Sequence, residues 1–224
     1  MTPNTTFNDR PWYGELLDTL VRSNEPASRT YRYMARLLER EFGADSAGRA
    51  LALLEVDDER SAVESTLMLA HSLHAELDVE VLLVDTRLKQ KGRGLSAQLG
   101  LLGSPGFAEL ISGAATSIAK CVVPTRLPGV YLLPCGVAPP SGMQDRRALL
   151  SLVSEARGRF RWVLLQVGSV LSDTRYLLTA MQADAVFAVA TEQKTRMTDL
   201  ERCDELLRDN GVGGLRVVLV GERR

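Results

Sequence analysis

The sequence predicts a doubly wound α/β fold, in which a mostly parallel β-sheet is flanked by helices on both faces. Short, almost continuous apolar runs alternate with longer amphipathic stretches, which is typical of parallel strands buried on both faces and joined by helices. The chain has 224 residues, 45% of them hydrophobic, which is enough for one substantial core. We therefore expect a single α/β domain over residues 26–224, preceded by a polar leader over residues 1–25.

The elements follow from the periodicity of the apolar residues. The first helix is expected at Pro26–Phe42, where Tyr31, Met34 and Leu38 recur at helical spacing and Gly43 then ends the pattern. Strands are expected at Ala50–Val56, Val81–Asp85, Val130–Leu133, Trp162–Val167, Ala185–Ala190 and Leu215–Val220. The helices expected between them span Ala62–Leu77, Phe107–Ser112, Gln144–Gly158, Thr174–Met181 and Arg196–Asn210.

Composition and charge exclude several classes of protein. The net charge of -1 gives no reason to expect a nucleic-acid partner. The longest apolar runs, such as residues 81–84, are far shorter than a bilayer requires, and the polar first ten residues do not predict a secretory signal. Cys121, Cys135 and Cys203 form an odd, widely spaced set, as expected of buried thiols in a reducing cytosol. We therefore expect a cytoplasmic protein.

The turn after the first predicted strand is the most informative segment. In a nucleotide-binding chain of this build, a phosphate loop with the sequence G-x-x-x-x-G-K-[ST] lies there. The corresponding residues from Asp58 to Thr66 read D-E-R-S-A-V-E-S-T. The Ser65-Thr66 pair is kept, with Ser65 at the last position of the motif, but Asp58 and Val63 replace the glycines that let the backbone wrap around phosphate. Glu64 replaces the lysine, which turns an attraction of about 4 kcal/mol at a separation of ~4 Å into a repulsion.

Other interpretations of this turn and other ligand motifs have weaker support. The alternative for this segment is an ordinary turn from a strand into a helix, with Asp57 or Ser61 as the N-cap. The glycines of 211–214 come between a helix and a strand, which is the reverse of the phosphate-binding order. His71 and His74 lie three residues apart, but no further ligand is found at zinc-binding spacing, so we expect no metal.

Several further segments follow one another in a distinctive order: R-T-Y-R at 29–32, V-L-L-V-D at 81–85, G-F-A-E-L at 106–110, V-Y-L-L-P-C-G at 130–136, F-R-W-V-L-L at 160–165 and S-D at 172–173. In this order they resemble the cytoplasmic ATPase domain of the bacterial tyrosine kinases that serve exopolysaccharide export, a group similar to the MinD/ParA ATPases. The resemblance covers nearly the whole chain after about Arg29. It implies a fold of the phosphate-loop ATPase type.

The sequence departs from this family where the family binds Mg²⁺ and nucleotide. The family's second strand ends in D-x-D and a later strand ends in D-x-P-P; this chain keeps Asp85 but has Arg87 and Gln166 at the other positions. Ser65 and Asp85 alone would hold a metal poorly. The family's kinases also phosphorylate a tyrosine-rich tail, whereas the last tyrosine here is Tyr176. The resemblance therefore implies a degenerate nucleotide site, with no catalytic residue, cofactor or metal expected. Its residues are Asp58, Val63, Glu64, Ser65, Thr66, Asp85, Arg87 and Gln166.

Two basic groups are candidate protein interfaces. The first is a stripe of arginines at steps of three and four on the predicted first helix. The matching helix of the family carries E-x-x-R-x-x-R at the protomer interface of a ring, and only Arg32 matches that pattern. The second is a basic loop at the carboxyl end of a strand, the edge where such sheets bind ligands. The alternative for both groups is a solvated surface, for the arginines one partly paired with Glu39 and Glu41. The candidate interface residues are Arg29, Arg32, Arg36, Arg40, Lys89, Lys91 and Arg93.

The kept scaffold and the degenerate site together predict a catalytically inactive pseudokinase or pseudo-ATPase, acting as a regulatory or scaffolding component of bacterial exopolysaccharide synthesis and export. The resemblance implies that its partner is a membrane-anchored polysaccharide chain-length regulator or an active kinase paralogue, with a homo-oligomer as a further option. Such a partner would recruit it to the inner membrane. Two alternatives stay open: a weakly active or nucleotide-binding ATPase or tyrosine kinase of the same pathway, and a MinD/ParA-like positioning factor.

Overall fold

The computed structural model describes residues 26–43, 47–57, 59–87, 94–137 and 146–221, and only the backbone for residues 26–28 and 59. The leader over residues 1–25 and four candidate site residues, Asp58, Lys89, Lys91 and Arg93, lie outside the described residues. The strands are β1 (Arg49–Glu55), β2 (Val81–Asp85), β3 (Val123–Pro124), β4 (Val130–Leu133), β5 (Trp162–Val167), β6 (Ala185–Thr191) and β7 (Arg216–Val220). The helices are α2 (Pro26–Phe42), α3 (Glu59–Leu77), α4 (Leu95–Gln98), α5 (Phe107–Ile111), the 3-10 helix η1 (Ile118–Lys120), α6 (Arg146–Arg157), α7 (Tyr176–Ala180) and α8 (Met197–Asp209).

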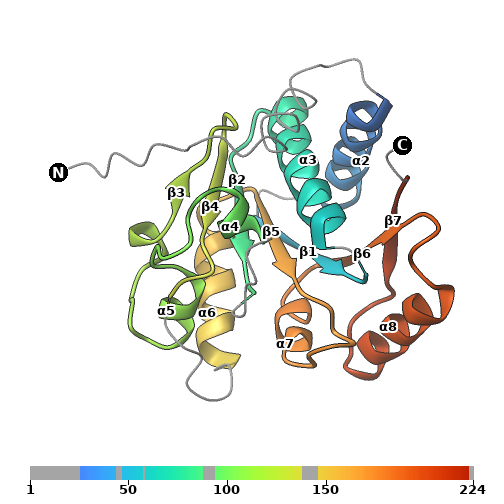
Figure 1. The fold of residues 1–224 in the computed structure, drawn as a ribbon. Helices are drawn as coiled ribbons and strands as arrows, with labels where there is room; N and C mark the ends of the chain where they lie inside the picture. The colour runs from blue at the N-terminus through green and yellow to red at the C-terminus, as the bar shows by residue number, and fades with distance from the viewer. Residues whose placement is uncertain (1–25, 44–46, 58, 88–93, 138–145, 222–224) are drawn as a thin grey trace.

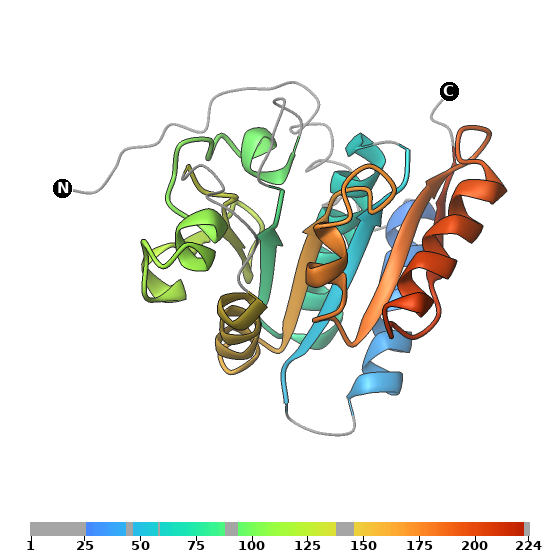
Figure 2. The same ribbon diagram turned by 90° about the horizontal axis from the view of Figure 1, so that it is seen from below.

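The described strands form one seven-stranded sheet in the order β3-β4-β2-β5-β1-β6-β7. Every neighbouring pair is parallel except β3 and β4, which are antiparallel. Helices α2 and α3 cover one face, and α5, α6, α7 and α8 lie on the other (Figures 1 and 2). The predicted fold class, a doubly wound and mostly parallel sheet flanked by helices, is confirmed.

Each central strand contributes to two cores, one on each face of the sheet. In β1, Leu51 and Leu53 pack under α2 and α3, whereas Ala52 and Leu54 pack under the helices of the opposite face. Successive side chains of a strand point to opposite faces, so a strand covered on both sides must be apolar throughout. This explains why the predicted strands appear in the sequence as continuous apolar runs.

The six predicted strands and six predicted helices are present, with ends that differ by at most three residues among those described. The largest difference in a boundary is at the start of α3, which begins at Glu59 rather than at the predicted Ala62. Three elements were not predicted: α4, η1 and β3, which span two to four residues each. Segments this short have too few residues to show a periodic apolar pattern.

Candidate functional site

The carboxyl ends of β2, β5 and β1 are adjacent at the centre of the sheet, and the predicted degenerate site divides there into two groups. Asp85 ends β2 and is the register partner of Gln166 on β5, while the hydroxyl of Thr66 on α3 hydrogen-bonds the Gln166 side chain. These three residues are therefore brought together. Val63, Glu64 and Ser65 are buried elsewhere along α3. The carboxyl edge of a doubly wound sheet is where ligands bind in this architecture.

The connection from β1 to α3 is short. Three residues, 56–58, separate Glu55 at the end of β1 from Glu59 at the start of α3. Glu64 is consequently the sixth residue of the helix and lies in its second turn. Backbone N–H groups at that depth donate to carbonyls four residues earlier, so they are not available to surround a phosphate. Ser61 is inside the helix, so the interpretation of Ser61 as its N-cap is wrong.

Glu64 and Ser65 contribute to the packing of α3 and its surroundings. The Glu64 carboxylate lies 2.9 Å from Nε of Arg60, one turn earlier. The Tyr31 hydroxyl of α2 donates to Oγ of Ser65 at 2.8 Å. Burial raises the pKa of Tyr31, the Ser65 hydrogen bond lowers it, and the negative charge of Glu64 raises it further. Glu64, which was compared with the lysine of the phosphate motif, therefore lies near the α2–α3 interface.

A guanidinium group lies between two carboxylates at the carboxyl edge. Nη1 of Arg87 is 3.3 Å from Oε2 of Glu55, and its Nε is 3.7 Å from Oδ1 of Asp85. The Arg87 side chain is 6% exposed and Asp85 is fully buried. Glu55 was not among the predicted site residues, although it directly follows the apolar run of β1. The positive charge at this edge is thus supplied by the chain itself.

Asp85 is also held by hydrogen bonds from α4. Its Oδ2 accepts from the backbone N–H of Ser96 at 2.8 Å and from the Ser96 hydroxyl at 2.7 Å. The Ser96 Oγ in turn accepts from the N–H of Cys135 at 2.8 Å. The N–H of Arg87 approaches Oδ1 of Asp85 at 3.3 Å. Because an ionised carboxylate can only accept hydrogen bonds, these donors satisfy much of its capacity and fix its orientation.

Gln166 of β5 places a neutral amide in the middle of this edge. It is fully buried, and its Nε2 has no hydrogen-bond partner within the described part of the chain. The Thr66 hydroxyl, which contacts its Oε1, also lies 2.8 Å from the carbonyl oxygen of Ala62. An amide carries no charge to offset that of a divalent cation, so this side chain is a poorer ligand for Mg²⁺ than a carboxylate would be.

Tyr176 covers the same edge from α7 and was not predicted to belong to the site. A Cβ on Gly168, the residue after β5, would lie 2.5 Å from Cε2 of Tyr176, so the ring packs directly against that glycine. Burial raises the pKa of Tyr176, while the charge of Arg87 lowers it and those of Asp173, Glu55 and Asp85 raise it. A glycine directly after a buried strand was the one sequence signal for this close approach.

These residues do not fit a magnesium–nucleotide complex of the phosphate-loop type. The chain is helical from Glu59 onward, where a loop would have to surround the phosphates, Gln166 offers only a neutral amide, and Arg87 lies beside Asp85. In the described ranges no three His, Cys, Asp or Glu side chains group in a way that could hold a metal ion. The arrangement can instead hold the ends of β1 and β2 together through the ion pairs of Arg87 with Glu55 and Asp85.

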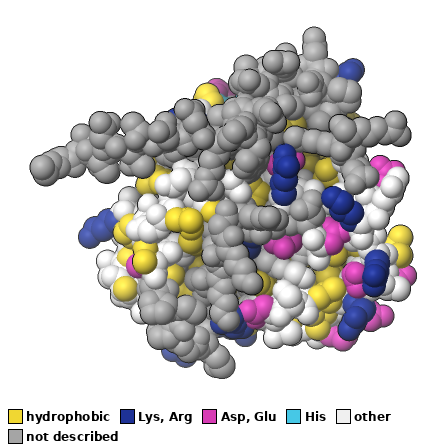
Figure 3. Space-filling model, in the orientation of Figure 1, with side chains coloured by type: hydrophobic (Ala, Val, Ile, Leu, Met, Phe, Trp, Pro, Cys, Tyr) yellow, Lys and Arg dark blue, Asp and Glu magenta, His cyan; other side chains and the backbone are white. Residues whose placement is uncertain are grey.

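The positive charge of the predicted arginine stripe on α2 is partly neutralised by Glu76, a residue of α3. Nε of Arg32 lies 2.6 Å from Oε1 of Glu76, and Nε of Arg36 lies 2.7 Å from its Oε2. Arg29 and Arg40 are exposed. The expected pairing with the two glutamates of α2 is wrong: Glu39 binds Arg161 and Glu41 binds Arg216. Over α8, by contrast, basic and acidic side chains lie next to one another on the surface (Figure 3).

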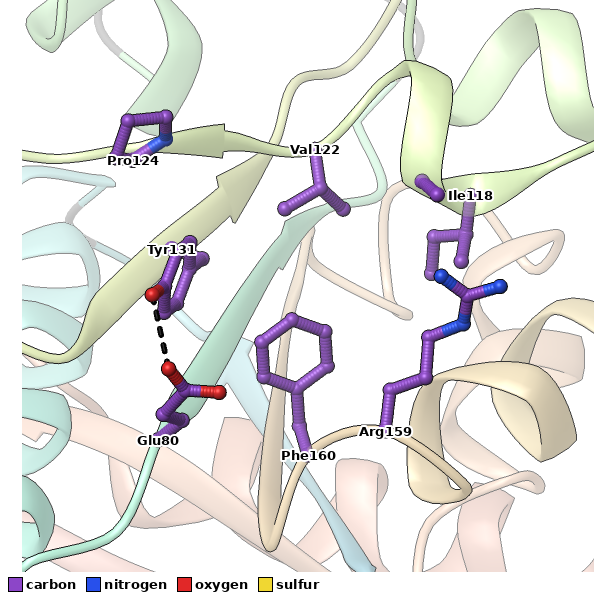
Figure 4. A pocket seen from close by; sticks show the side chains of 8 residues that line it. Glu80, Ile118, Val122, Pro124, Tyr131, Arg159 and Phe160 are labelled. Atoms are coloured by element: carbon purple, nitrogen blue, oxygen red, sulfur yellow. Dashed lines mark hydrogen bonds between the residues drawn. The ribbon is translucent and has the colours of Figure 1, made fainter.

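A separate cavity of about 270 Å³ lies near the opposite, amino edge of the sheet (Figure 4). The rings of Tyr131 and Phe160 lie 5.5 Å apart along it, and the Tyr131 hydroxyl donates to Glu80 at 2.9 Å. Ile118 and Val122 add apolar walls, and Arg159 lies at one side. The cavity is distinct from the carboxyl edge, because Glu80 and Phe160 precede β2 and β5 in the chain.

No protein-family model matches the sequence, and no curated protein matches it. Solved structures do resemble it. The kinase domain of Escherichia coli tyrosine kinase ETK has a TM-score of 0.76 and 18% identity, over 92% of this chain and 81% of that one. The VpsO kinase domain has a TM-score of 0.73 and 21% identity, over 95% and 100%. The MinD cell division protein of Aquifex aeolicus has a TM-score of 0.61 and 16% identity, over 77% and 69%.

These likenesses show the fold, and they agree with the resemblance found in the sequence. Solved structures with this fold include cytoplasmic domains of bacterial tyrosine kinases and ATPases of the MinD and ParA types. Among the described residues, none of the helices combines the length and the apolar content needed to cross a bilayer.

Proposed function

We propose that this protein is a catalytically inactive pseudokinase or pseudo-ATPase that acts as a regulatory or scaffolding component of bacterial exopolysaccharide synthesis and export. The observation that carries the proposal is the guanidinium of Arg87, which lies between Glu55 and Asp85 at the edge where a relative would bind Mg²⁺ and nucleotide. The fold shared with tyrosine kinase domains supports the pathway.

The proposed inactivity follows from competition between an internal cation and an external one. A tethered guanidinium has no association entropy to lose, whereas a magnesium ion must lose both its freedom and part of its hydration shell. Arg87 is held from two sides and is almost fully buried. Mg²⁺ would have to displace it before contacting Asp85, and within the described residues the helical start of α3 at Glu59 leaves no phosphate loop that could offset this cost through the nucleotide.

Isothermal titration calorimetry with ATP and ADP, each with and without Mg²⁺, tests this part of the proposal. We expect no binding heat at protein concentrations of tens of micromolar. A dissociation constant in the micromolar range, which corresponds to a binding free energy of about -8 kcal/mol, would contradict the proposal. It would favour the alternative of a weakly active or nucleotide-binding ATPase or tyrosine kinase.

The proposed binding surface is the outer face of α2. Arg29 and Arg40 are exposed on this helix, and Arg32 and Arg36 share the single carboxylate of Glu76. The face therefore carries an excess of positive charge, which suits an acidic segment of a partner. The partner we propose is a membrane-anchored polysaccharide chain-length regulator or an active kinase paralogue, which would recruit the protein to the inner membrane.

Affinity capture from the native cell, with proteins identified by mass spectrometry, tests the partner. We expect the chain-length regulator or the kinase paralogue to be captured by the wild type and lost with Arg29→Glu/Arg40→Glu. The matched control is Lys120→Glu/Lys194→Glu, which changes the net charge equally at exposed positions elsewhere. Recovery of general chaperones alone, or equal loss with both double variants, would contradict the proposed surface.

A further inference from the structure

The two edges of the described sheet differ in how they are protected. Edge strand β3 has two residues, runs antiparallel to β4 and contains Pro124, which has no N–H to donate. Edge strand β7 has five residues, and the four from Val217 to Val220 include neither a charged residue nor a proline. Charged residues, prolines and short strands are the usual means by which an edge is kept from pairing with another chain. By these criteria β3 is protected against pairing with a strand of another chain, whereas β7 is not.

The side chains of β7 support the same distinction. Val218 and Val220 pack against the core under α2 and α3. Val217 and Leu219 point to the opposite face, where they are 51% and 67% exposed. A strand that is apolar on both faces is typical of the middle of a sheet, yet β7 is the last strand after β6 (Figure 2). Its composition therefore suits a strand with a second neighbour.

We infer that β7 pairs with β7 of a second copy of this chain, antiparallel and across a twofold axis, so that one sheet continues through both copies. The twofold register that uses all five residues of the strand is centred on Val218. It places Val217 opposite Leu219 of the second copy, on the same face of the joined sheet, and the reciprocal pair is formed as well. The two most exposed side chains of the strand then cover each other, and the backbone edge gains hydrogen-bond partners.

A second copy fits this edge better than a charged partner does. The one charge on β7 belongs to Arg216, whose guanidinium binds Glu41 and lies 5.5 Å from the ring centroids of Phe42 and Phe187. That charge is satisfied within the chain, so β7 offers an uncharged, self-complementary edge. The contact covers one strand edge and two large apolar side chains per copy, which is less than a standard interface. The dimer should therefore be concentration-dependent, with a dissociation constant in the micromolar range.

Sedimentation equilibrium of the full chain tests the dimer. Val217→Lys/Leu219→Lys should raise the dissociation constant about tenfold or more, because lysines on an edge oppose strand pairing. The matched control is Leu150→Lys, at an exposed leucine of α6 far along the chain, which should leave the dimer unchanged. Thermal melting of the three proteins shows whether the edge variants remain folded; the substituted side chains are exposed, so similar melting curves are expected.

Cysteine cross-linking tests the register. In the twofold pair the Cα atoms of residue 218 lie about 4.5–5.5 Å apart, within the range of roughly 4.4–6.8 Å that a disulfide spans. Val218→Cys should therefore form a covalent dimer under mild oxidation, whereas Val217→Cys, which faces Leu219, should form little. A monomer at every concentration, a dimer unaffected by the edge lysines, or cross-linking equal to that of the wild type, with its three native cysteines, would overturn the inference. None of these outcomes depends on nucleotide binding.

Discussion

Arg87→Met removes the guanidinium at the carboxyl edge while keeping an apolar stem of similar length. It would leave the buried carboxylate of Asp85 without the cation beside it. Breaking a buried ion pair in this way costs about 3–5 kcal/mol when the remaining charge has no other partner. Asp85 keeps two hydrogen bonds from Ser96, at 2.8 and 2.7 Å, and the side chain of Glu55 is 22% exposed. We therefore expect a loss of about 2–3 kcal/mol, or roughly 4–12 °C in melting temperature for a chain of this size.

Urea denaturation of the single and double variants measures this loss. If Arg87 is the counter-ion of Asp85, then Asp85→Asn should be less destabilising in the Arg87→Met background than in the wild type, by about 1–2 kcal/mol. Millimolar Mg²⁺ should stabilise Arg87→Met more than the wild type, because the cation position is then vacant. Additive losses in the double variant, together with an equal response of both proteins to Mg²⁺, would refute the counter-ion role of Arg87.

Three further predictions concern individual side chains. Glu64→Lys restores the lysine of the phosphate motif inside a helix and breaks the contact with Arg60; calorimetry should detect no gain in ATP binding, and stability should fall by roughly 1–3 kcal/mol. Gly168→Ala places a methyl group against the ring of Tyr176, so urea denaturation should show a loss of about 1–3 kcal/mol, largely recovered with Tyr176→Leu. Burial, followed by the charge of Asp199, raises the pKa of Cys203 from 9.0 to about 11. The unfolded chain therefore loses this proton first, and the free energy of unfolding should fall between pH 9 and 11, less steeply in Cys203→Ala.

The fold was predictable because its signals are local. The run at Val81–Asp85 is buried at every position, so its composition alone identifies a central strand, and the structure has the same boundaries. The helix at Pro26–Phe42 likewise shows its buried face directly in the spacing of its apolar residues. Strand order was not predicted, since it depends on contacts between segments far apart in the sequence. The antiparallel strand at Val123–Pro124 was missed because two residues carry no pattern.

The site was predictable only where a known motif supplied the comparison. Of the eight residues assigned to the degenerate site, Asp85, Gln166 and Thr66 lie together in the structure. The contact between Arg87 and Glu55 joins residues 32 positions apart and belongs to no motif, so nothing in the sequence indicated it. The segment before Ala62 was compared with a phosphate loop. It contains no glycine, and the structure shows that α3 begins as early as Glu59.

An arginine placed beside two carboxylates can remove a metal site and stabilise the chain at the same time. A metal site gathers carboxylates whose mutual repulsion is offset only when the ion is bound, so the empty site costs stability. Arg87 supplies a permanent cation in contact with Asp85 and Glu55, and thereby removes that cost. Glu55, Asp85 and Arg87 belong to neither of the two apolar cores on the faces of the sheet. Under the proposed loss of catalysis, an internal charge pair of this kind is favoured by stability alone, and a lysine introduced at position 64 should not by itself produce ATPase activity.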